Sequence, residues 1–309
     1  MVISAYTVDR WALTRAAVES SRAQTVPVDK VVLCVDDNPE LFRMAEDEWT
    51  EGSGVPVQVM TNRGEDTVEG PSGSASARNV AIAAVDSEVV VFLDDDARPE
   101  PDWVERLLVL YADPDVVAVG GAPLPVYESP RPLWYPTNFD WVFGCIYDGL
   151  PRSISQLDRL IGANMSVRRE ALSRVGGFGV DYPIDDLELC LKLGAEYGRN
   201  GLYYTPDAVV HHFVSAERLT WRYFRRRCFS VNREKVHLFE RLGAAADMGA
   251  ERRFALHSLK HRIGGDLREA SGGDFTAFAR MAAMFAGLSF AAAGRVRGLL
   301  DARLERRSG

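Results

Sequence analysis

An apolar, β-branched run in the first half of the chain constrains its fold most. Residues 89–93 have the sequence Val-Val-Val-Phe-Leu and place no polar side chain on either face. Such a run is typical of a strand buried on both faces of a sheet. Three aspartates, Asp94, Asp95 and Asp96, follow it directly. Their carboxylates should therefore emerge at the carboxyl edge of the sheet, where open α/β sheets bind their ligands.

Strand and helix patterns alternate along the N-terminal part of the chain. Apolar runs predict strands at residues 2–6, 31–35, 55–60 and 89–93, and amphipathic patterns predict helices at residues 10–22, 75–85 and 102–111 and directly after Pro39. Because parallel strands need crossover helices, this order predicts an α/β fold with a Rossmann-like, mostly parallel sheet flanked by helices.

The composition is that of a globular protein in a reducing compartment. Its 47% hydrophobic and 26% charged residues are ordinary for soluble domains. The cysteines, Cys34, Cys145, Cys190 and Cys228, show neither Cys-x-x-Cys pairing nor zinc spacing. No signal peptide precedes the first strand, and no uninterrupted apolar run reaches the roughly 18 to 20 residues that a spanning helix needs. We therefore expect a cytoplasmic protein.

Charge separates an acidic body from a basic C-terminal region. Residues 216–309 hold 19 Lys and Arg against 10 Asp and Glu, a balance of +9, whereas residues 1–215 hold 17 against 34, a balance of −17. The acidic body argues against nucleic acid as a partner. The basic region, expected to be mainly helical, either contacts the inner face of an anionic cell membrane, as a peripheral membrane protein does, or packs on the body with a solvated basic face.

The aspartate cluster has two explanations. Burying unpaired carboxylates costs on the order of several kcal/mol, whereas a divalent cation that bridges to a diphosphate satisfies all three charges. Alternatively, the cluster is a turn in which one aspartate caps the helix that starts near Asp102. The surrounding motifs favour a site for Mn²⁺ or Mg²⁺.

A dinucleotide-binding Rossmann domain is the obvious competitor, but its motif is missing. The turn at residues 6–9 has the sequence Tyr-Thr-Val-Asp instead of Gly-x-Gly-x-x-Gly. Glycines lie instead in residues 70–79, a Gly/Ser-rich loop that ends in Arg78 and Asn79. Backbone N–H groups of such a loop, together with Arg78, can bind phosphate, although a flexible linker has the same composition.

A set of motifs in this order resembles glycosyltransferase family 2, whose members have the GT-A fold. The motifs are Asp36-Asp37, Ala77-Arg78-Asn79, the DxD-like residues 92–96, and residues 162–169, 175–178, 185–189 and 206–212. The resemblance extends from about residue 2 to about residue 230. It implies a GT-A catalytic domain at residues 1–215, with a nucleotide-sugar half at 1–121 and an acceptor half at 122–215. Charge and helical patterns, in turn, predict a C-terminal helical appendage at residues 216–309.

The resemblance implies how the nucleotide-sugar donor binds. Asp36 should contact the uracil or another base, and Arg78 and Asn79 should lie near the base and phosphates. Asp94 should approach the ribose, and Asp95 should belong to the same donor site.

The resemblance also implies a metal on the diphosphate, held by Asp96 and His212, and a general base, Asp186. The chemistry agrees, because a cation stabilises the leaving diphosphate and an attacking hydroxyl needs a carboxylate within about 3 Å. Asp185 stands where the family usually has Glu. Alternatively, Asp185 and Asp186 cap a helix. His211 and His212 alternate along a strand, so only one can face the site.

Acceptor contacts are predicted from an aromatic segment and two polar residues. Trp134 and Trp141 either stack on the acceptor or pack the core, and Asp140 is a candidate contact for an acceptor hydroxyl. Asn164 and Asp185 complete the predicted acceptor site.

Two C-terminal segments have helical patterns. Residues 220–229 predict an amphipathic helix with three successive arginines, and residues 275–294 are rich in Ala, Phe and Met with a basic flank. The second segment suits an interfacial helix better than a spanning one, or a helix that packs on the catalytic domain.

Together these features predict an inverting, metal-dependent glycosyltransferase that moves a sugar from a nucleotide-diphosphate sugar, with a UDP-sugar as the first candidate, to an acceptor hydroxyl. Residues 139–145 and 161–165 are similar to a branch that includes glucosyl-dolichyl-phosphate glucuronosyltransferases, whose acceptors are lipid-linked sugars. A polysaccharide or other glycan, or a small secondary metabolite, is an alternative acceptor. A nucleotidyltransferase with a similar acidic metal site and a non-catalytic sugar-nucleotide-binding protein are alternative functions.

Overall fold

The computed structural model describes residues 1–50, 53–63, 72–243 and 263–308. Internal contacts divide the chain into two units. Unit 1 comprises Met1–Leu124 and Pro151–Phe213, and unit 2 comprises Pro125–Leu150 and Val214–Gly309. The functional division predicted at residues 121 and 215 stays a prediction.

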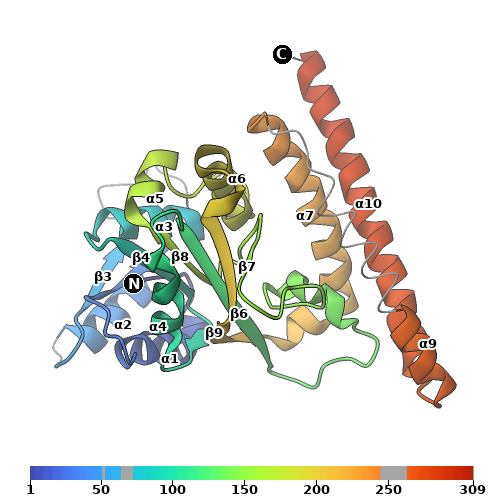
Figure 1. Ribbon diagram of the computed structural model, residues 1–309, viewed down its shortest axis with the longest axis horizontal. Helices are drawn as coiled ribbons and strands as arrows, with labels where there is room; N and C mark the ends of the chain where they lie inside the picture. Colours follow the sequence, from blue (N-terminus) through green and yellow to red (C-terminus); the bar gives the residue numbers. More distant parts are fainter. Residues whose placement is uncertain (51–52, 64–71, 244–262, 309) are drawn as a thin grey trace. The chain divides into compact units, whose positions relative to one another are not determined.

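One sheet of nine strands has the order β3-β2-β1-β4-β8-β6-β9-β5, with β7 paired to β9 (Figure 1). The strands are β1 (Val2–Ala5), β2 (Val31–Val35), β3 (Val57–Thr61), β4 (Val89–Asp94), β5 (Ala97–Pro99), β6 (Ala118–Tyr127), β7 (Ser155–Gln156), β8 (Asn164–Arg168) and β9 (Leu202–Val214). β1 pairs in parallel with β2 and β4, and β2 pairs in parallel with β3, which confirms the predicted Rossmann-like core. β8 pairs antiparallel with β4 and β6 and so extends the parallel part with strands of mixed direction.

Helices cover both faces of this sheet in unit 1. They are α1 (Trp11–Arg22), α2 (Pro39–Trp49), α3 (Ser74–Ala83), α4 (Trp103–Leu108), α5 (Arg169–Val175) and α6 (Asp185–Tyr197). Successive strand residues point to opposite faces. Ile3 and Leu33 pack in one cluster with α1, α2 and α4, whereas Val32 and Phe92 pack in another with α3, α5 and α6. The β-branched strands are therefore buried on both sides, as their sequences predict.

Local sequence explains where some helices begin and end. Asn38 caps α2, because its side chain accepts a hydrogen bond from Leu41 N at 3.0 Å, and Pro39 occupies the first turn. α5 ends at Gly176, whose φ of +75° lies in the left-handed region that glycine tolerates.

The connection from β4 to β5 places the aspartates at a strand end. β4 ends at Asp94 and β5 begins at Ala97, so the turn between them carries the rest of the cluster. Ala97 pairs with His212 of β9, and Phe213 N donates to Asp96 O at 2.8 Å. This pairing brings a histidine from far along the chain to the acidic turn.

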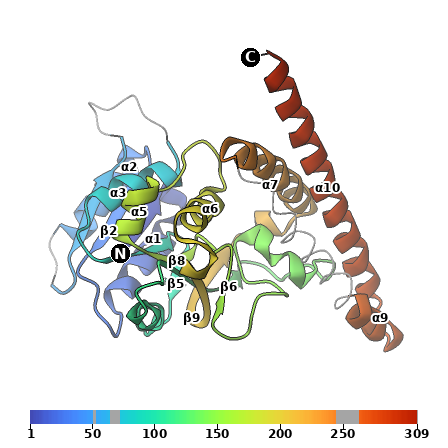
Figure 2. The same cartoon turned by 45° about the horizontal axis from the view of Figure 1, so that its top comes forward.

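Unit 2 contains the 3₁₀ helix η3 (Thr137–Phe143) and the helices α7 (Trp221–Arg241), α9 (Ile263–Ser271) and α10 (Thr276–Ser308). α7 lies alongside α10 in both views (Figures 1 and 2). Small residues of α10 permit this close approach, because a Cβ at Gly294 would collide with the carbonyl oxygen of Phe229 and one at Gly298 would lie 2.7 Å from Arg233 O. The helix pair is therefore packed backbone to backbone along part of its length.

α10 also has the length and composition of a membrane span. Residues Thr276–Leu304 reach a mean hydropathy of 1.4 over their most apolar window, of which 33% is buried. The expectation that no uninterrupted apolar run reaches spanning length is not contradicted by this finding, because Arg280 and Arg295 interrupt the run. The criterion rests on length and composition alone.

Candidate active site

The turn between β4 and β5 carries a compact acidic cluster in unit 1. Asp95 and Asp96 are each 4% exposed, and Asp94 is half-buried. His212 Nε2 lies 3.0 Å from Asp96 Oδ1 and 3.9 Å from Asp94 Oδ2. The structure thus brings together the predicted metal pair of Asp96 and His212.

Arg10, the residue directly before α1, pairs with the same cluster. Its Nη1 lies 2.8 Å from Asp96 Oδ2 and 3.4 Å from Asp95 Oδ1. Asp95 Oδ2 is buried and has no hydrogen-bond partner among the described residues. Burial, together with the charge of Asp96, raises the pKa of Asp95 to about 7. Arg10 therefore offsets the negative charge of Asp95 and Asp96 only in part.

The cluster fits a divalent cation. Asp94, Asp96 and His212 each offer one ligand atom, and these atoms lie within 4.8 Å of one another. Two carboxylate oxygens and one imidazole nitrogen form a donor set that suits Mn²⁺, and the carboxylates also suit Mg²⁺. Asp94, which the resemblance assigns to the ribose, is thereby a candidate ligand as well.

Arg78 of α3 connects Asp94 to the first turn of α6. It is 5% exposed, its Nη2 lies 2.7 Å from Asp94 Oδ1, and its Nη1 lies 2.8 Å from Asp185 Oδ2. The guanidinium carbon lies 5.2 Å from the centroid of the Phe178 ring. Burial opposes the charge of Arg78, but the carboxylates of Asp185, Asp94 and Asp186 raise its pKa overall. Arg78 therefore remains a buried cation.

Asp186, the predicted general base, lies in the first turn of α6. Its Oδ1 accepts a hydrogen bond from Leu187 N at 2.7 Å, and its Oδ2 accepts one from Gly162 N at 3.2 Å. Arg159 Nη2 lies 3.7 Å from the same Oδ2. The backbone donors fix the orientation of the carboxylate. The N-cap position of α6 is Ile184, which makes no side-chain capping hydrogen bond, and Asp186 lies within the first turn as an acidic residue near the helix N-terminus.

Asp36, the predicted contact of the base, directly follows β2. Its Oδ1 and Oδ2 accept from Gly73 N at 2.8 and 2.9 Å, and Asn62 Nδ2 donates to Oδ1 at 2.7 Å. Gly73 has a φ of +111°, a conformation that favours glycine. Asp36 thus ties the start of α3 to the sheet. Gly70 and Pro71 of the predicted phosphate loop lie outside the described residues.

Two predicted site residues form hydrogen bonds that support the fold. Asn79 Nδ2 donates to Phe178 O at 2.8 Å, and its Oδ1 accepts from Phe178 N at 2.9 Å. Asn164 has 0% exposure; its Oδ1 accepts from Trp103 Nε1 at 2.8 Å, and its Nδ2 donates to Ala208 O at 2.9 Å. Asn164 therefore supports the core in this conformation, and its acceptor contact stays a prediction.

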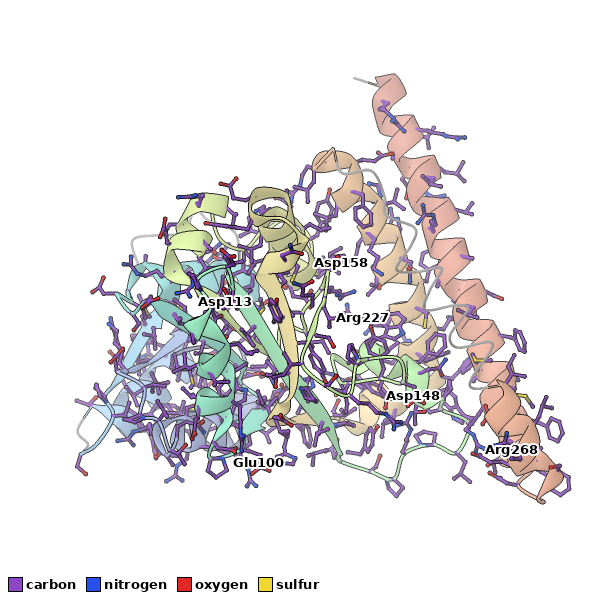
Figure 3. All side chains as sticks on the ribbon, viewed as in Figure 1. Glu100, Asp113, Asp148, Asp158, Arg227 and Arg268 are labelled. Carbon is purple, nitrogen blue, oxygen red and sulfur yellow. The ribbon has the colours of Figure 1, made fainter. Side chains whose placement is uncertain are left out.

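His211 and His212, neighbours on β9, contact different carboxylates. His211 Nε2 lies 2.6 Å from Oε1 of Glu100, which is labelled in Figure 3. His212 is 3% exposed and lies against the acidic cluster. The alternation of side chains along a strand accounts for this division.

The aromatic acceptor candidates lie in unit 2. Trp134 is 5.2 Å from Trp221 between ring centroids, and Trp141 is partly buried against the core of that unit. Asp140 forms a two-point pair with Arg131, with both oxygens 2.8 Å from guanidinium nitrogens. Burial raises the pKa of Asp140 to about 6, although Arg131 opposes the shift. These residues help to build unit 2, and their contact with an acceptor stays a prediction.

Arg10 and Asn62 contact predicted site residues but are not among the site residues predicted from the sequence. Arg10 is separated from Asp95 and Asp96 by 85 and 86 residues, a pairing that no local pattern indicates. One signal does exist in the sequence. Arg10 follows the first strand, and the carboxyl ends of parallel strands share one edge of the sheet with Asp96.

The model of the family described as glycosyl transferase family 2 matches residues 1–176 of this chain. The chain belongs to glycosyltransferase family 2. The family and GT-A fold predicted from the motifs are confirmed, and the chain is a glycosyltransferase that uses a nucleotide-sugar donor. Family membership favours glycosyl transfer over the two alternatives, nucleotidyl transfer and non-catalytic binding.

Relatives and solved structures agree with this assignment. A glucosyl-dolichyl phosphate glucuronosyltransferase of Haloferax volcanii is 28% identical over 235 residues, which is 73% of this chain and 72% of that protein. The mannosyltransferase PcManGT from Pyrobaculum calidifontis, in complex with GDP-Man and Mn²⁺, is similar with a TM-score of 0.57 at 18% identity, over 97% of this chain and 87% of that one. GalNAc-T7 with UDP, GalNAc and Mn²⁺ is similar with a TM-score of 0.54 at 15% identity, over 83% of this chain and 54% of that one. At these identities the structural likeness concerns the fold.

Proposed function

We propose that this enzyme is inverting and metal-dependent, and that it moves a sugar from a UDP-sugar to a hydroxyl of a lipid-linked sugar. The observation that carries the proposal is the geometry of Asp94, Asp96 and His212, whose ligand atoms lie within 4.8 Å of one another at a strand end. Two proteins of similar fold were solved with Mn²⁺, which supports a metal in this enzyme.

The donor site is proposed to use the acidic cluster and Asp36. Asp94, Asp96 and His212 would hold Mn²⁺ or Mg²⁺, which when bound stabilises the negative charge of the leaving diphosphate. Asp36, next to Gly73 and the start of α3, is proposed to contact the base. Arg10 holds Asp96 through Oδ2, so that Oδ1 stays on the side of His212.

Asp186 is proposed to be the general base. It accepts the proton of the acceptor hydroxyl while the oxygen of that hydroxyl forms a bond to the anomeric carbon of the donor sugar. The bond from the anomeric carbon to the diphosphate oxygen breaks on the opposite face, and the nucleoside diphosphate leaves with the electron pair. A single displacement of this kind inverts the configuration at the anomeric carbon.

The lipid-linked acceptor is proposed from a relative and from α10. The Haloferax volcanii relative is named for a glucosyl-dolichyl phosphate acceptor. Phe275, just before α10, and Phe278 and Phe285 within it are each at least 50% exposed, and Arg297 and Arg306 of the same helix are exposed as well. An apolar face with basic residues suits contact with an anionic bilayer, where a lipid-linked acceptor resides.

A donor screen tests the proposal. The melting temperature of the full-length protein is measured with UDP-, GDP- and dTDP-sugars in the presence of Mn²⁺, Mg²⁺ or EDTA. A ligand at about 100 times its dissociation constant stabilises the folded state by roughly 2.7 kcal/mol. We expect stabilisation by a UDP-sugar that needs the metal. Equal stabilisation in EDTA would contradict metal dependence, and a response to GDP-sugars alone would contradict the choice of base.

Co-sedimentation with vesicles tests the membrane contact. The wild-type chain and the variant Phe278→Glu/Phe285→Glu are mixed with anionic and neutral vesicles at low and high salt. We expect anionic vesicles to bind the wild type at low salt, with about 1 kcal/mol at most from each basic residue, and to bind the variant much less. Val109→Glu, at an exposed apolar position of unit 1, is the matched control. Absence of wild-type binding would favour a soluble acceptor.

A further inference from the structure

One guanidinium group joins two catalytic elements of unit 1. Arg78 Nη2 lies 2.7 Å from Asp94 Oδ1 at the end of β4, and Arg78 Nη1 lies 2.8 Å from Asp185 Oδ2 at the start of α6. Asp94 and Asp185 are 91 positions apart in sequence, so no local turn holds them together. The fork of an arginine can satisfy two carboxylates at once in a fixed geometry, which a lysine cannot.

Asp185 also contacts the backbone of Asp186. While its Oδ2 accepts from Arg78, its Oδ1 accepts from Asp186 N at 3.1 Å. Both carboxylate oxygens of Asp185 are therefore engaged, one by the guanidinium and the other by the backbone of the proposed base. Position and orientation of Asp186 depend on the backbone that Asp185 holds.

The surroundings of Arg78 limit its movement. It is 5% exposed and packs on the ring of Phe178, whose backbone N–H and C=O both bond to Asn79, the next residue of α3. Two neighbouring residues of α3 therefore anchor α6: Asn79 binds the segment before it, and Arg78 binds its first turn. Because a buried arginine keeps its charge, it remains a permanent anchor for both carboxylates.

We propose that Arg78 and Asp185 are positioning residues that fix the proposed base, Asp186, relative to the metal cluster at the end of β4. The proposal rests on the proposed function for the role of Asp186. It gives Asp185 a part in the reaction other than the predicted acceptor contact, because its carboxylate acts through Asp186. Loss of the Asp185 carboxylate should lower the rate of transfer without weakening donor binding at the metal.

The test uses Asp185→Asn in the full-length enzyme, because asparagine has one acceptor oxygen where Asp185 uses two. Amide hydrogen exchange at Asp186, Leu187 and Glu188 is measured without donor or metal and should become about tenfold faster as the first turn of α6 loosens. The turnover number should fall roughly 10-fold to 100-fold, the scale of a small misplacement of a reacting group, while the dissociation constant of UDP with Mn²⁺ changes less than about twofold. Asp185→Glu keeps the charge and should restore most of both properties.

Arg78→Gln and the double variant Arg78→Gln/Asp185→Asn complete a double-mutant cycle. Because the two residues act as one pair, amide exchange in the double variant should be little faster than in either single variant. Asp102→Asn, which removes one partner of the exposed Arg106–Asp102 pair at 2.9 Å, is the matched control and should leave exchange in α6 unchanged. Unchanged exchange at Asp186–Glu188 in Asp185→Asn would overturn the proposal, as would a loss of UDP affinity with normal turnover. Hydrogen exchange reports on positioning even if no glycosyl transfer is found, so failure of the proposed function is distinguishable.

Discussion

Replacement of Asp186 by asparagine distinguishes between two roles of this residue, that of a general base and that of a helix cap. The amide has no basic oxygen to take the proton of an acceptor hydroxyl, so the turnover number should fall by about 10² to 10⁴, the usual contribution of a positioned general base. The amide keeps the size of the side chain. A residue that only caps α6 would leave the turnover number close to that of the wild type.

The structure gives the expected cost in stability. Asp186 accepts from Leu187 N at 2.7 Å and from Gly162 N at 3.2 Å, and asparagine can replace only one of these acceptors. Loss of one hydrogen bond costs about 1 kcal/mol, and loss of a negative charge at a helix N-terminus costs roughly 0.3 to 1 kcal/mol. The variant should therefore melt about 2 to 8 °C below the wild type and remain folded at 25 °C.

The assay combines turnover with nucleotide affinity. Transfer from the UDP-sugar found in the donor screen to a short-chain glucosyl polyprenyl phosphate is followed with Mn²⁺, and UDP binding is measured by calorimetry. We expect UDP affinity to change less than about twofold, because Asp186 holds no donor group in the proposed site. Glu196→Gln, at an exposed position of α6, is the control. A normal turnover number in Asp186→Asn would refute the reasoning.

Three further changes test other parts of the structure. Asp96→Asn should reduce the affinity of UDP in the presence of Mn²⁺ by at least about tenfold and leave the weak metal-free affinity unchanged in calorimetry, because it removes a metal ligand; an unchanged effect of Mn²⁺ would exclude Asp96 as a ligand. Asp36→Asn should weaken UDP binding with and without Mn²⁺ alike in the same titration, since it acts on the base; a loss confined to the metal-bound state would argue against base contact. Gly294→Val should lower the melting temperature, because its side chain collides with the backbone of Phe229 and overpacking costs roughly 1 to 3 kcal/mol, whereas Ala293→Val at an exposed position should not; equal melting of the two would contradict the close packing of α7 and α10.

The regular elements of unit 1 follow closely from the sequence. The predicted strand at residues 31–35 coincides with β2, and the predicted helix at 10–22 nearly coincides with α1. Apolar β-branched runs and amphipathic periods are local signals, and burial on both faces of a parallel sheet makes them strong. The antiparallel strand β8 is harder to predict, because its partners β4 and β6 are set by the tertiary fold.

The site is predictable in its residues and less so in its contacts. Asp96 and His212 are indicated by the family motifs, and the structure places them 3.0 Å apart. Arg10 pairs with Asp95 and Asp96, which are 85 and 86 positions away, and Arg78 pairs with Asp185, which is 107 positions away. The sequence has no periodic signal for these ion pairs. Asn164 is a motif residue that the sequence assigns to the acceptor site, whereas its hydrogen bonds in the structure support the core.

Product analysis tests the proposed reaction most directly. The enzyme, Mn²⁺, the UDP-sugar and the glucosyl polyprenyl phosphate are incubated together, the released nucleotide is identified, and the anomeric configuration of the product is determined by proton NMR. We expect UDP and a single glycoside whose anomeric configuration is opposite to that of the donor, and neither product when Asp186 is Asn. Pyrophosphate in place of UDP, or a glycoside with the configuration of the donor, would contradict inverting glycosyl transfer.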